Sequence, residues 1–508
     1  MRTDEMPEPS TAADRACRLI ASIGGEAETL ARALGSIDRR ADLLELRLDR
    51  VCRDAVGGLV SSSPLPVVAT CRRRSDAGGF DGDDHEREAR LLAAVQAGAA
   101  WVDLEWGSEL ARHARRFTPA RVILSWHDFS ATPADLAGRL ASMRSTEGAT
   151  WYKLVPTARR LSDLVRLRDL LRGATDLIAF GMGATGTASR ILAAAWGSRA
   201  VYAAGSSEPT APGQITISDM LELYRLRDLG PGTRVAGLLG RPLGHSLSPR
   251  LHNEAYRMLE LDWVYVPFES EQVDELRDFL ISLEISGASV TIPHKEAVLA
   301  QLDDVEALAR RIGAVNTIVR RGGSLLGTNT DAEAALAPLR RQIPLRGKRV
   351  ALLGAGGAAR ALAFTLPQEG CEVKIFNRTE RRARQLAQES GVRWGRWREL
   401  EREDYDLLIN ATPVGMAPDT EAAPVPQTWL RGSLVYDIIY NPAETALLRS
   451  ARARGLDTLG GLEMFVGQAA AQFRLFTGAA PPLDVLRTTV EAALGTRLQR
   501  PAGRDGRV

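Results

Sequence analysis

Lysine, cysteine and long apolar segments are scarce in this sequence, and each shortage narrows the class of protein. The 508 residues include four scattered cysteines, Cys17, Cys52, Cys71 and Cys371, whose spacing fits neither a metal site nor a disulfide framework. No apolar run is long enough to cross a bilayer. The 65 basic and 63 acidic residues leave a formal net charge of +2, which gives no overall attraction to nucleic acid. We therefore expect a cytoplasmic protein without a metal and without membrane or nucleic-acid partners.

The shortage of lysine is the most informative, because arginine supplies almost every positive charge. Only Lys153, Lys295, Lys348 and Lys374 are lysine among the 65 basic residues. An arginine does not readily lose its proton, whereas a lysine amine can attack a carbonyl or donate a proton. Lys348 and Lys374 adjoin two predicted strands and are expected to be solvated charges. Lys153 and Lys295 are therefore the candidates for chemistry.

The chain is too long for one hydrophobic core, and its first half alternates strand-like and helix-like segments. This alternation predicts a (β/α)8 barrel, in which reactive residues gather at the carboxyl ends of the strands. The predicted strands are Arg18–Ile23, Asp42–Leu48, Pro66–Arg72, Trp101–Trp106, Arg121–Trp126, Thr150–Val155, Asp176–Phe180 and Ala200–Ala204.

Polar side chains near the ends of these strands form a candidate site. Lys153, in the sequence Trp-Tyr-Lys-Leu-Val, is expected to point into the barrel, where burial favours the neutral amine as a nucleophile. His127 ends the preceding strand and is a candidate general acid and base, with Glu45 available to orient its ring. The alternative is that His127 is a hydrogen-bonded core residue and Lys153 a surface residue.

A glycine turn at Val350–Arg360 organises the second half. Apolar residues are followed by Gly354, Gly356 and Gly357 and then by a helix start, the pattern of a turn that lies against a dinucleotide pyrophosphate. The next strand, Val373–Phe376, ends in cationic and polar residues instead of the carboxylate that suits NAD, which favours NADP. A tight turn without a ligand is the alternative.

A second set of polar residues follows other strands of this half. Ser246, Ser248, Lys295, Asn316 and Asp331 supply hydroxyl, amine, amide and carboxylate groups, which suit a small polyhydroxylated acid. Lys295 and Asp331 are predicted to form a proton-transfer pair beside the nicotinamide. The alternative is that they form a structural ion pair.

The first half resembles type I 3-dehydroquinate dehydratase through five motifs in the same order. They are ADLLELRLD (41–49), VILSWHDFSATP (122–133), WYKLV (151–155), GATGTASRIL (183–192) and EPTAPGQITISDM (208–220). The resemblance implies that Lys153 forms a Schiff base with the substrate ketone, that His127 moves the protons and that Glu45 pairs with His127. It also implies a set of residues that hold the substrate, namely Arg190 for the carboxylate and Arg47, Arg72, Thr210 and Gln214 for hydroxyls and closure.

The loop after the third strand departs from this family. It reads RRRSDAGG (72–79), with Ala77 where the family usually has glutamate and with an apparent extra residue. The extra residue leaves open whether Arg72 or Arg73 contacts the substrate.

The second half resembles shikimate dehydrogenase from end to end. The motifs are GRPLGHSLSPRLHN (240–253), ASVTIPHKE (288–296), GAVNTI (313–318), GTNTDA (327–332), GAGGAAR (354–360), NRTERRA (377–383), INATPVGM (409–416), YDIIYNPAET (436–445) and GGLEMFVGQAA (460–470). The resemblance implies that Lys295 and Asp331 are catalytic. The implied substrate-binding residues are Ser246, Ser248, Thr291, Asn316, Tyr440 and Gln468. The implied NADP-binding residues are Gly354, Ala355, Gly356, Gly357, Ala358, Asn377, Arg378, Thr379, Arg382, Thr412 and Gly461.

Together the halves predict a fused enzyme with two consecutive reactions, dehydration of 3-dehydroquinate to 3-dehydroshikimate and NADPH-dependent reduction to shikimate. Alternatives are a non-catalytic barrel, or a preference for quinate over shikimate; the oligomeric state stays open. The expected divisions are a disordered tail (1–15), the barrel (16–228), a substrate lobe (234–336, completed by 461–495), a Rossmann-type NADP lobe (337–460) and a second disordered tail (496–508).

Overall fold

In the computed structural model the chain divides into two compact units. The structure describes residues 17–206, 210–211, 213–244 and 246–499. One unit holds the described residues up to Arg234 together with Val266–Leu283, and the other holds Val235–Tyr265 and the described residues from Glu284. The predicted tail 1–15 and the residues after 499 lie outside the described ranges.

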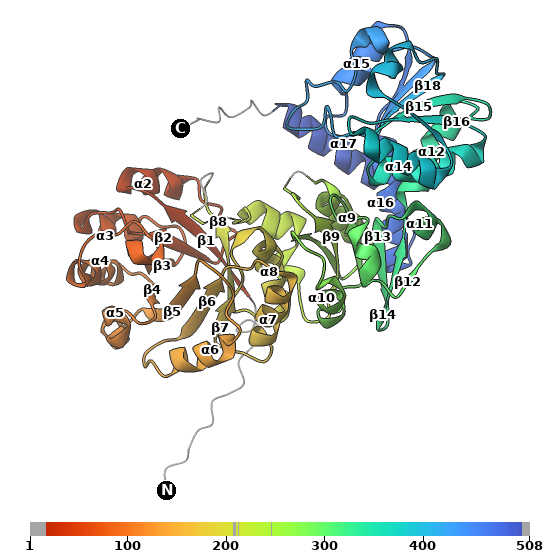
Figure 1. The fold of residues 1–508 in the computed structure, drawn as a ribbon. Helices are drawn as coiled ribbons and strands as arrows, with labels where there is room; N and C mark the ends of the chain where they lie inside the picture. Colours follow the sequence, from red (N-terminus) through yellow and green to blue (C-terminus); the bar gives the residue numbers. More distant parts are fainter. Residues whose placement is uncertain (1–16, 207–209, 212, 245, 500–508) are drawn as a thin grey trace. The chain divides into compact units, whose positions relative to one another are not determined.

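The first unit contains an eight-stranded parallel sheet in the order β7-β6-β5-β4-β3-β2-β1-β8. Contacts between β7 and β8 nearly close this sheet into a barrel, which helices surround in Figure 1. The (β/α)8 prediction is therefore confirmed, with strand ends within about two residues of those expected. The strands are β1 (Arg18–Gly24), β2 (Leu43–Arg47), β3 (Val67–Thr70), β4 (Trp101–Glu105), β5 (Arg121–Asp128), β6 (Trp151–Pro156), β7 (Leu177–Ala179) and β8 (Ala200–Ala204).

The barrel strands are buried almost throughout, as expected when helices cover a parallel sheet. Inside the barrel the Trp101 and Trp151 rings stack with centroids 4.1 Å apart. The surrounding helices are α2 (Ala27–Gly35), α3 (Arg53–Ser61), α4 (Asp84–Gln96), α5 (Glu109–Arg112), α6 (Leu136–Arg144), α7 (Leu161–Leu171) and α8 (Gly183–Trp196).

The substrate lobe, predicted at 234–336, contains a mixed sheet in the order β10-β9-β11-β13-β14-β12. Strand β11 runs parallel to β9 and antiparallel to β13, and a turn at Gly322-Gly323 joins β13 to β14 as a hairpin. The elements are β9 (Arg234–Gly240), α9 (Ser248–Met258), β10 (Trp263–Glu269), α10 (Leu276–Ser282), β11 (Gly287–Val290), β12 (Asp304–Val305), α11 (Ala307–Ile312), β13 (Thr317–Arg321), β14 (Ser324–Thr328) and α12 (Asp331–Gln342).

The Rossmann-type lobe contains a parallel sheet in the order β17-β16-β15-β18-β19-β20. Alternate residues of its central strand enter two cores, since Val350 and Leu352 pack in one and Ala351 and Leu353 in the other. The predicted Rossmann-type sheet is confirmed. The elements are β15 (Arg349–Leu353), α13 (Gly357–Thr365), β16 (Glu372–Phe376), α14 (Glu380–Ser390), β17 (Arg393–Gly395), β18 (Leu407–Asn410), β19 (Leu434–Asp437), α15 (Ala446–Ala453) and β20 (Asp457–Leu459).

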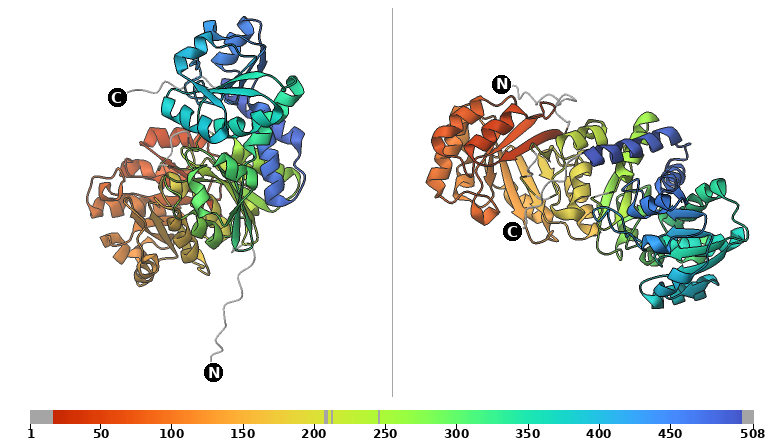
Figure 2. Two further views of the ribbon diagram at one scale, coloured as in Figure 1. Left: turned by 45° about the vertical axis from the view of Figure 1, so that its right-hand side comes forward. Right: turned by 90° about the horizontal axis from the view of Figure 1, so that it is seen from above.

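Two final helices return to the substrate lobe. Helix α16 (Leu462–Thr477) and helix α17 (Leu483–Gln499) share a core with α9 that includes Leu251, Phe473 and Leu486. Figure 2 shows these dark blue helices beside the green elements of that lobe. Helix α17 ends at Gln499. Within the described ranges, no helix is both long and apolar enough to span a membrane.

Two matched leucines test how far packing in the second unit determines stability. Leu362 on α13 is completely buried, whereas Leu483 at the start of α17 is 55% exposed. Leu362→Ala is expected to lower the free energy of unfolding by about 2–5 kcal/mol, because it removes methyl groups and leaves a cavity. Leu483→Ala is expected to change it by less than about 0.5 kcal/mol. Denaturant unfolding followed by tryptophan fluorescence measures both, and equal effects would contradict the assigned core.

Candidate active sites

Lys153 lies in a buried cluster of charged and polar groups inside the barrel. Its Nζ donates to Oδ2 of Asp103 over 2.7 Å and lies 4.4 Å from the centroid of the Tyr202 ring. The other Asp103 oxygen, Oδ1, accepts from Arg72 Nη2 at 2.8 Å and from Ser125 Oγ at 2.6 Å. Lys153 itself is 4% exposed. The alternative of a surface lysine is therefore wrong.

His127 borders this cluster at the end of β5. Its Nδ1 lies 3.4 Å from Arg72 Nη1, and its ring is stacked at 6.0 Å from that of Phe129. Burial, together with the positive charges of Arg72 and Lys153, holds the pKa of His127 well below its usual range. The imidazole is therefore neutral at physiological pH and available to accept a proton.

Glu45 lies on β2 and forms hydrogen bonds with residues of the neighbouring strands β1 and β3. Its oxygens accept from Ser22 Oγ and from Thr70 Oγ1, the latter at 2.9 Å. The Ser22 hydroxyl also lies 2.7 Å from Oγ1 of Thr210. The hydrogen bonds of Glu45 in the described structure do not include His127, so the expected Glu45–His127 pair is not formed here.

The structure distinguishes the two arginines that the sequence left open. Arg72 is buried and contacts Asp103 and Ser125, whereas Arg73 is part of the following loop, where its Nε donates to Asp76 at 3.0 Å. Ala77 ends a short 3₁₀ turn in the same loop, with a left-handed φ of 55°. Arg72 therefore belongs to the cluster around Lys153, whereas Arg73 belongs to the loop.

The residues expected to hold substrate in the barrel differ in their hydrogen-bond and ion-pair partners. Arg190 on α8 is buried, and its guanidinium has no hydrogen-bond or ion-pair partner among the described residues; burial lowers its pKa to about 10. Arg47 pairs with Asp49 at 2.6 Å. Gln214 Oε1 accepts from the backbone N–H of Thr210 at 2.9 Å. The Arg190 guanidinium lies over the Phe180 ring, 4.7 Å from its centroid, and a buried arginine without a carboxylate partner favours an anionic ligand.

The second site is centred on Lys295 and Asp331. Lys295 Nζ donates to Asp331 Oδ2 at 2.5 Å, and Asn316 Nδ2 donates to Asp331 Oδ1 at 2.7 Å. Asn316 Oδ1 in turn accepts from the backbone N–H of Thr330 at 2.8 Å. Asp331 is 1% exposed, whereas the Lys295 side chain is 17% exposed. The amine thus faces accessible space, while the carboxylate is held in the interior.

The other residues expected to bind substrate lie at the start of α9, after β11, after β19 and on α16. Ser246 donates to Ser248 Oγ at 3.3 Å, just before α9, and Thr291 directly follows β11, which is paired with β9. Tyr440 stacks on Phe465 of α16 with ring centroids 3.9 Å apart. Gln468 is half-buried on α16 and has no hydrogen-bond partner among the described side chains.

The glycine turn approaches the catalytic lysine. Gly354 has a φ of 111°, and a Cβ there would lie 2.8 Å from the carbonyl oxygen of Ala411, at the edge where β15 meets β18. A Cβ on Gly357 would lie 2.9 Å from Cδ of Lys295, while Gly356 faces open space. Because α13 begins at Gly357 without a side-chain cap, its free N–H groups suit a pyrophosphate. The turn therefore fits a dinucleotide beside Lys295.

The polar residues after β16 fit a 2′-phosphate. Arg378, Thr379 and Arg382 are exposed, and neither arginine has an ion-pair partner among the described residues. Asn377 Nδ2 donates to the carbonyl oxygen of Thr379 at 3.0 Å, which fixes the loop. The remaining residues expected to bind the cofactor are Ala355 and Ala358 at the glycine turn and the start of α13, Thr412 and Gly461. The Thr412 hydroxyl donates to Asn410 at 2.7 Å, and Gly461 directly precedes α16.

Two residues of these sites were missed from the sequence. Asp103 lies within a buried strand, and only its charge among apolar neighbours distinguishes it. Gln472, one turn after Gln468, accepts from Ser289 Oγ at 2.8 Å and donates to Thr317 Oγ1 at 3.2 Å. Both residues are polar positions inside a predicted strand or helix, whereas the predicted site residues were chosen mainly at strand ends.

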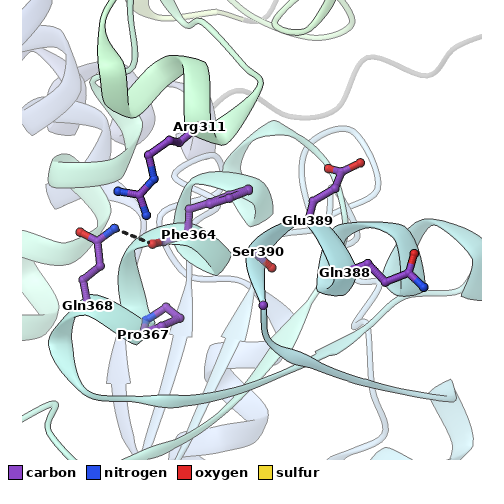
Figure 3. Close-up of a pocket in the computed structure, with 8 residues that line it drawn as sticks. Arg311, Phe364, Pro367, Gln368, Gln388, Glu389 and Ser390 are labelled. Atoms are coloured by element: carbon purple, nitrogen blue, oxygen red, sulfur yellow. Dashed lines mark hydrogen bonds between the residues drawn. The ribbon is translucent and has the colours of Figure 1, made fainter.

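A separate cavity of about 610 Å³ lies away from both sites. Figure 3 shows Arg311, Phe364, Gln368 and Glu389 among its lining residues, on α11, α13, the turn after α13, and α14. None of the predicted site residues lines it. Among the described residues there is no group of three or more His, Cys, Asp or Glu side chains arranged to hold a metal.

Family models match both halves of the chain. Residues 20–231 match type I 3-dehydroquinase. Residues 238–318 match the shikimate dehydrogenase substrate binding domain, residues 336–415 match shikimate/quinate 5-dehydrogenase, and residues 461–491 match the shikimate 5′-dehydrogenase C-terminal domain.

Individual proteins agree with these matches. The shikimate dehydrogenase (NADP+) of Methanothermobacter thermautotrophicus is 42% identical over 52% of this chain and 97% of its own. A crystal structure of a shikimate dehydrogenase in complex with NADP+ has a TM-score of 0.50 and 37% identity, covering 52% of this chain and 97% of that one. The chloroplastic bifunctional 3-dehydroquinate dehydratase/shikimate dehydrogenase of Arabidopsis thaliana is 38% identical over 88% of this chain and 79% of its own. The chain therefore belongs to the family of bifunctional 3-dehydroquinate dehydratase/shikimate dehydrogenases.

Proposed function

We propose that this enzyme dehydrates 3-dehydroquinate to 3-dehydroshikimate through Lys153 and His127, and reduces that product to shikimate through Lys295 and Asp331 with NADPH. The observation that carries this proposal is that both lysines singled out in a lysine-poor sequence contact a buried carboxylate. In the barrel, the buried Arg190 can bind an anionic group. In the second site, the Lys295 side chain is partly exposed. A non-catalytic barrel is disfavoured, because it would have no use for a buried Lys153 held against the buried Asp103.

In the barrel, the proposed first step joins the Lys153 nitrogen to the substrate ketone carbon, and the ketone oxygen leaves as water. The resulting cationic imine withdraws electrons and makes the neighbouring carbon acidic. The neutral His127 then takes a proton from that carbon and returns it to the departing hydroxyl, which also leaves as water. Hydrolysis of the imine frees Lys153.

The substrate carboxylate is assigned to Arg190, a buried cation that lies over the Phe180 ring and whose Nε has no hydrogen-bond partner in the described structure. Binding there adds an anionic partner to a buried charge, so the interaction is stronger than one at the surface. Arg47, Arg72, Thr210 and Gln214 are assigned to the substrate hydroxyls. Glu45 is assigned a catalytic role beside them, which the hydrogen bonds that connect it to Thr210 through Ser22 support.

In the dehydrogenase, Lys295 is assigned to donate a proton to the ketone oxygen as reduction proceeds. NADPH bound at the glycine turn supplies the hydride for this reduction. Asp331 orients the lysine amine, and Asn316 holds Asp331 in place. Ser246 and Ser248 are assigned to the substrate carboxylate, and Thr291, Asn316, Tyr440 and Gln468 to its hydroxyls and ring. The close approach of the Lys295 side chain to Gly357 supports placing the proton donor beside the bound dinucleotide.

The family matches indicate the ligands of this enzyme, and the cysteines bear on its location. Small-molecule substrates and NADP are the ligands of this family. We further propose a cytoplasmic location, which the four unpaired cysteines support, although the Arabidopsis relative is chloroplastic.

Lys153→Ala is expected to abolish the dehydratase and leave the dehydrogenase intact. Borohydride added with 3-dehydroquinate should attach substrate mass to Lys153 in the parent chain, because the reduced imine is stable, and to no residue in the variant. The dehydratase kcat should fall about 1,000-fold or more. Mass spectrometry of peptides reads the adduct, and the unchanged rate of shikimate oxidation serves as the control. A parent chain that turns over without an adduct contradicts the imine.

Lys295→Ala is expected to lower kcat for shikimate oxidation by about 100-fold or more, since general acid–base groups contribute rates of that order. Dehydration of 3-dehydroquinate should not change. The matched control is Lys348→Ala, which removes a half-exposed lysine that lies before β15. Steady-state rates with NADP+ measure both variants. Full activity of Lys295→Ala would show that its contact with Asp331 is only structural.

Arg378→Ala is expected to raise KM for NADP+ about 10-fold or more and to leave KM for NAD+ nearly unchanged. The reason is the loss of a charge-assisted contact with the 2′-phosphate. Arg393→Ala is the control, because this surface arginine already pairs with Glu372 at 3.0 Å. Steady-state kinetics with the two cofactors separate the cases, and an equal change in both KM values would argue against a phosphate contact.

A further inference from the structure

We propose that Asp103 is a catalytic counter-ion of the Lys153 nitrogen, balancing the positive charge that this nitrogen carries both before and after the imine forms. The inference rests on the proposed dehydratase function and adds a residue to it. Asp103 touches the reacting atom directly, with 2.7 Å between Oδ2 and Nζ.

The carboxylate of Asp103 is fixed so that one oxygen serves only the lysine. Oδ1 accepts from Arg72 and Ser125, and Oδ2 accepts from Lys153. Asp103 is 1% exposed. Burial alone would raise its pKa, but the charges of Lys153 and Arg72 and the hydrogen bonds from Lys153 and Ser125 hold the pKa well below its usual range. It therefore stays a carboxylate and acts through charge.

The charge on the lysine nitrogen is the same at both ends of imine formation. An ammonium and a ketone give an iminium and one water: the C–N bond forms, the C–O bond breaks, two nitrogen protons leave with the oxygen and one remains. A carboxylate placed for the ammonium is thus also placed for the iminium. Because the surroundings do not need to reorganise, this arrangement stabilises the cation at little cost.

The other buried carboxylates of the barrel form hydrogen bonds and ion pairs with residues other than Lys153. Glu105, further along β4, contacts Arg87 and lies 3.8 Å from Arg72. Glu45 accepts from Ser22 and Thr70. Of the carboxylates that the structure describes, only Asp103 is bonded to Lys153. The charged groups that act on His127 are Arg72, Lys153, Asp103 and Arg47. Glu105, Glu45 and Asp49 act on Arg72, and the Tyr202 ring faces the Lys153 amine.

The test compares Asp103→Asn with Glu105→Gln. Both remove a buried carboxylate from β4, but Glu105 does not touch Lys153, and burial already raises its pKa and so favours its neutral form. Dehydratase kcat, its pH profile and the yield of borohydride-trapped Lys153 are measured in the full chain. The rate of shikimate oxidation and the circular dichroism spectrum report whether each variant is folded.

Asp103→Asn is expected to lower kcat about 100-fold and to reduce the trapped fraction at saturating 3-dehydroquinate. The acid limb of its profile should move to lower pH, because Asp103 favours the protonated form of His127 and this influence is lost. Glu105→Gln should keep kcat within about threefold. A folded Asp103→Asn with the parent kcat, trapped fraction and acid limb overturns the inference.

Two further outcomes are separated by the design. If the parent chain itself gives no Lys153 adduct, the proposed dehydratase mechanism fails, and the counter-ion role fails with it. If Asp103→Asn does not fold, Asp103→Glu keeps the charge but displaces the oxygens by a methylene. That variant should lower kcat with little change in KM, and parent-like kcat would overturn the role of Asp103 as a precisely placed counter-ion.

Discussion

The contact between a lysine amine and a buried carboxylate is the interaction on which both sites depend. Lys153 meets Asp103 at 2.7 Å and Lys295 meets Asp331 at 2.5 Å, and in each pair the carboxylate is fixed by further donors. Arg72 and Ser125 hold Asp103, and Asn316 holds Asp331. A buried carboxylate held by several donors has a fixed position and therefore controls where the amine lies.

The two environments differ in a way that fits two reactions. Lys153 is almost completely buried against the Asp103 carboxylate and near a neutral histidine, which suits an amine that becomes a buried cationic imine. Lys295 is partly exposed and lies against the glycine turn, which suits an amine that gives a proton to a bound ketone. The first site needs no cofactor. The second is assembled from the substrate lobe, α16 and the glycine turn of the Rossmann-type lobe.

The sequence predicted the fold closely, because alternating apolar runs and turn residues are local signals. The eight barrel strands and the Gly354 turn are where the pattern placed them. The lysines were recognisable because arginine replaces lysine almost everywhere else. The hydrogen bonds between distant strands were not predictable: the approach of Arg72 to His127, the absence of a Glu45–His127 bond and the position of Asp103 depend on how residues far apart in the chain meet inside the barrel. The choice between Arg72 and Arg73 also required the course of the loop, which an apparent insertion hid.

The most direct test of two consecutive reactions in one chain is a coupled assay that starts from 3-dehydroquinate and NADPH with the purified protein alone. The account predicts that NADPH is consumed in proportion to 3-dehydroquinate and that shikimate accumulates as the final product. Unchanged 3-dehydroquinate, or 3-dehydroshikimate that accumulates without loss of NADPH, would contradict it.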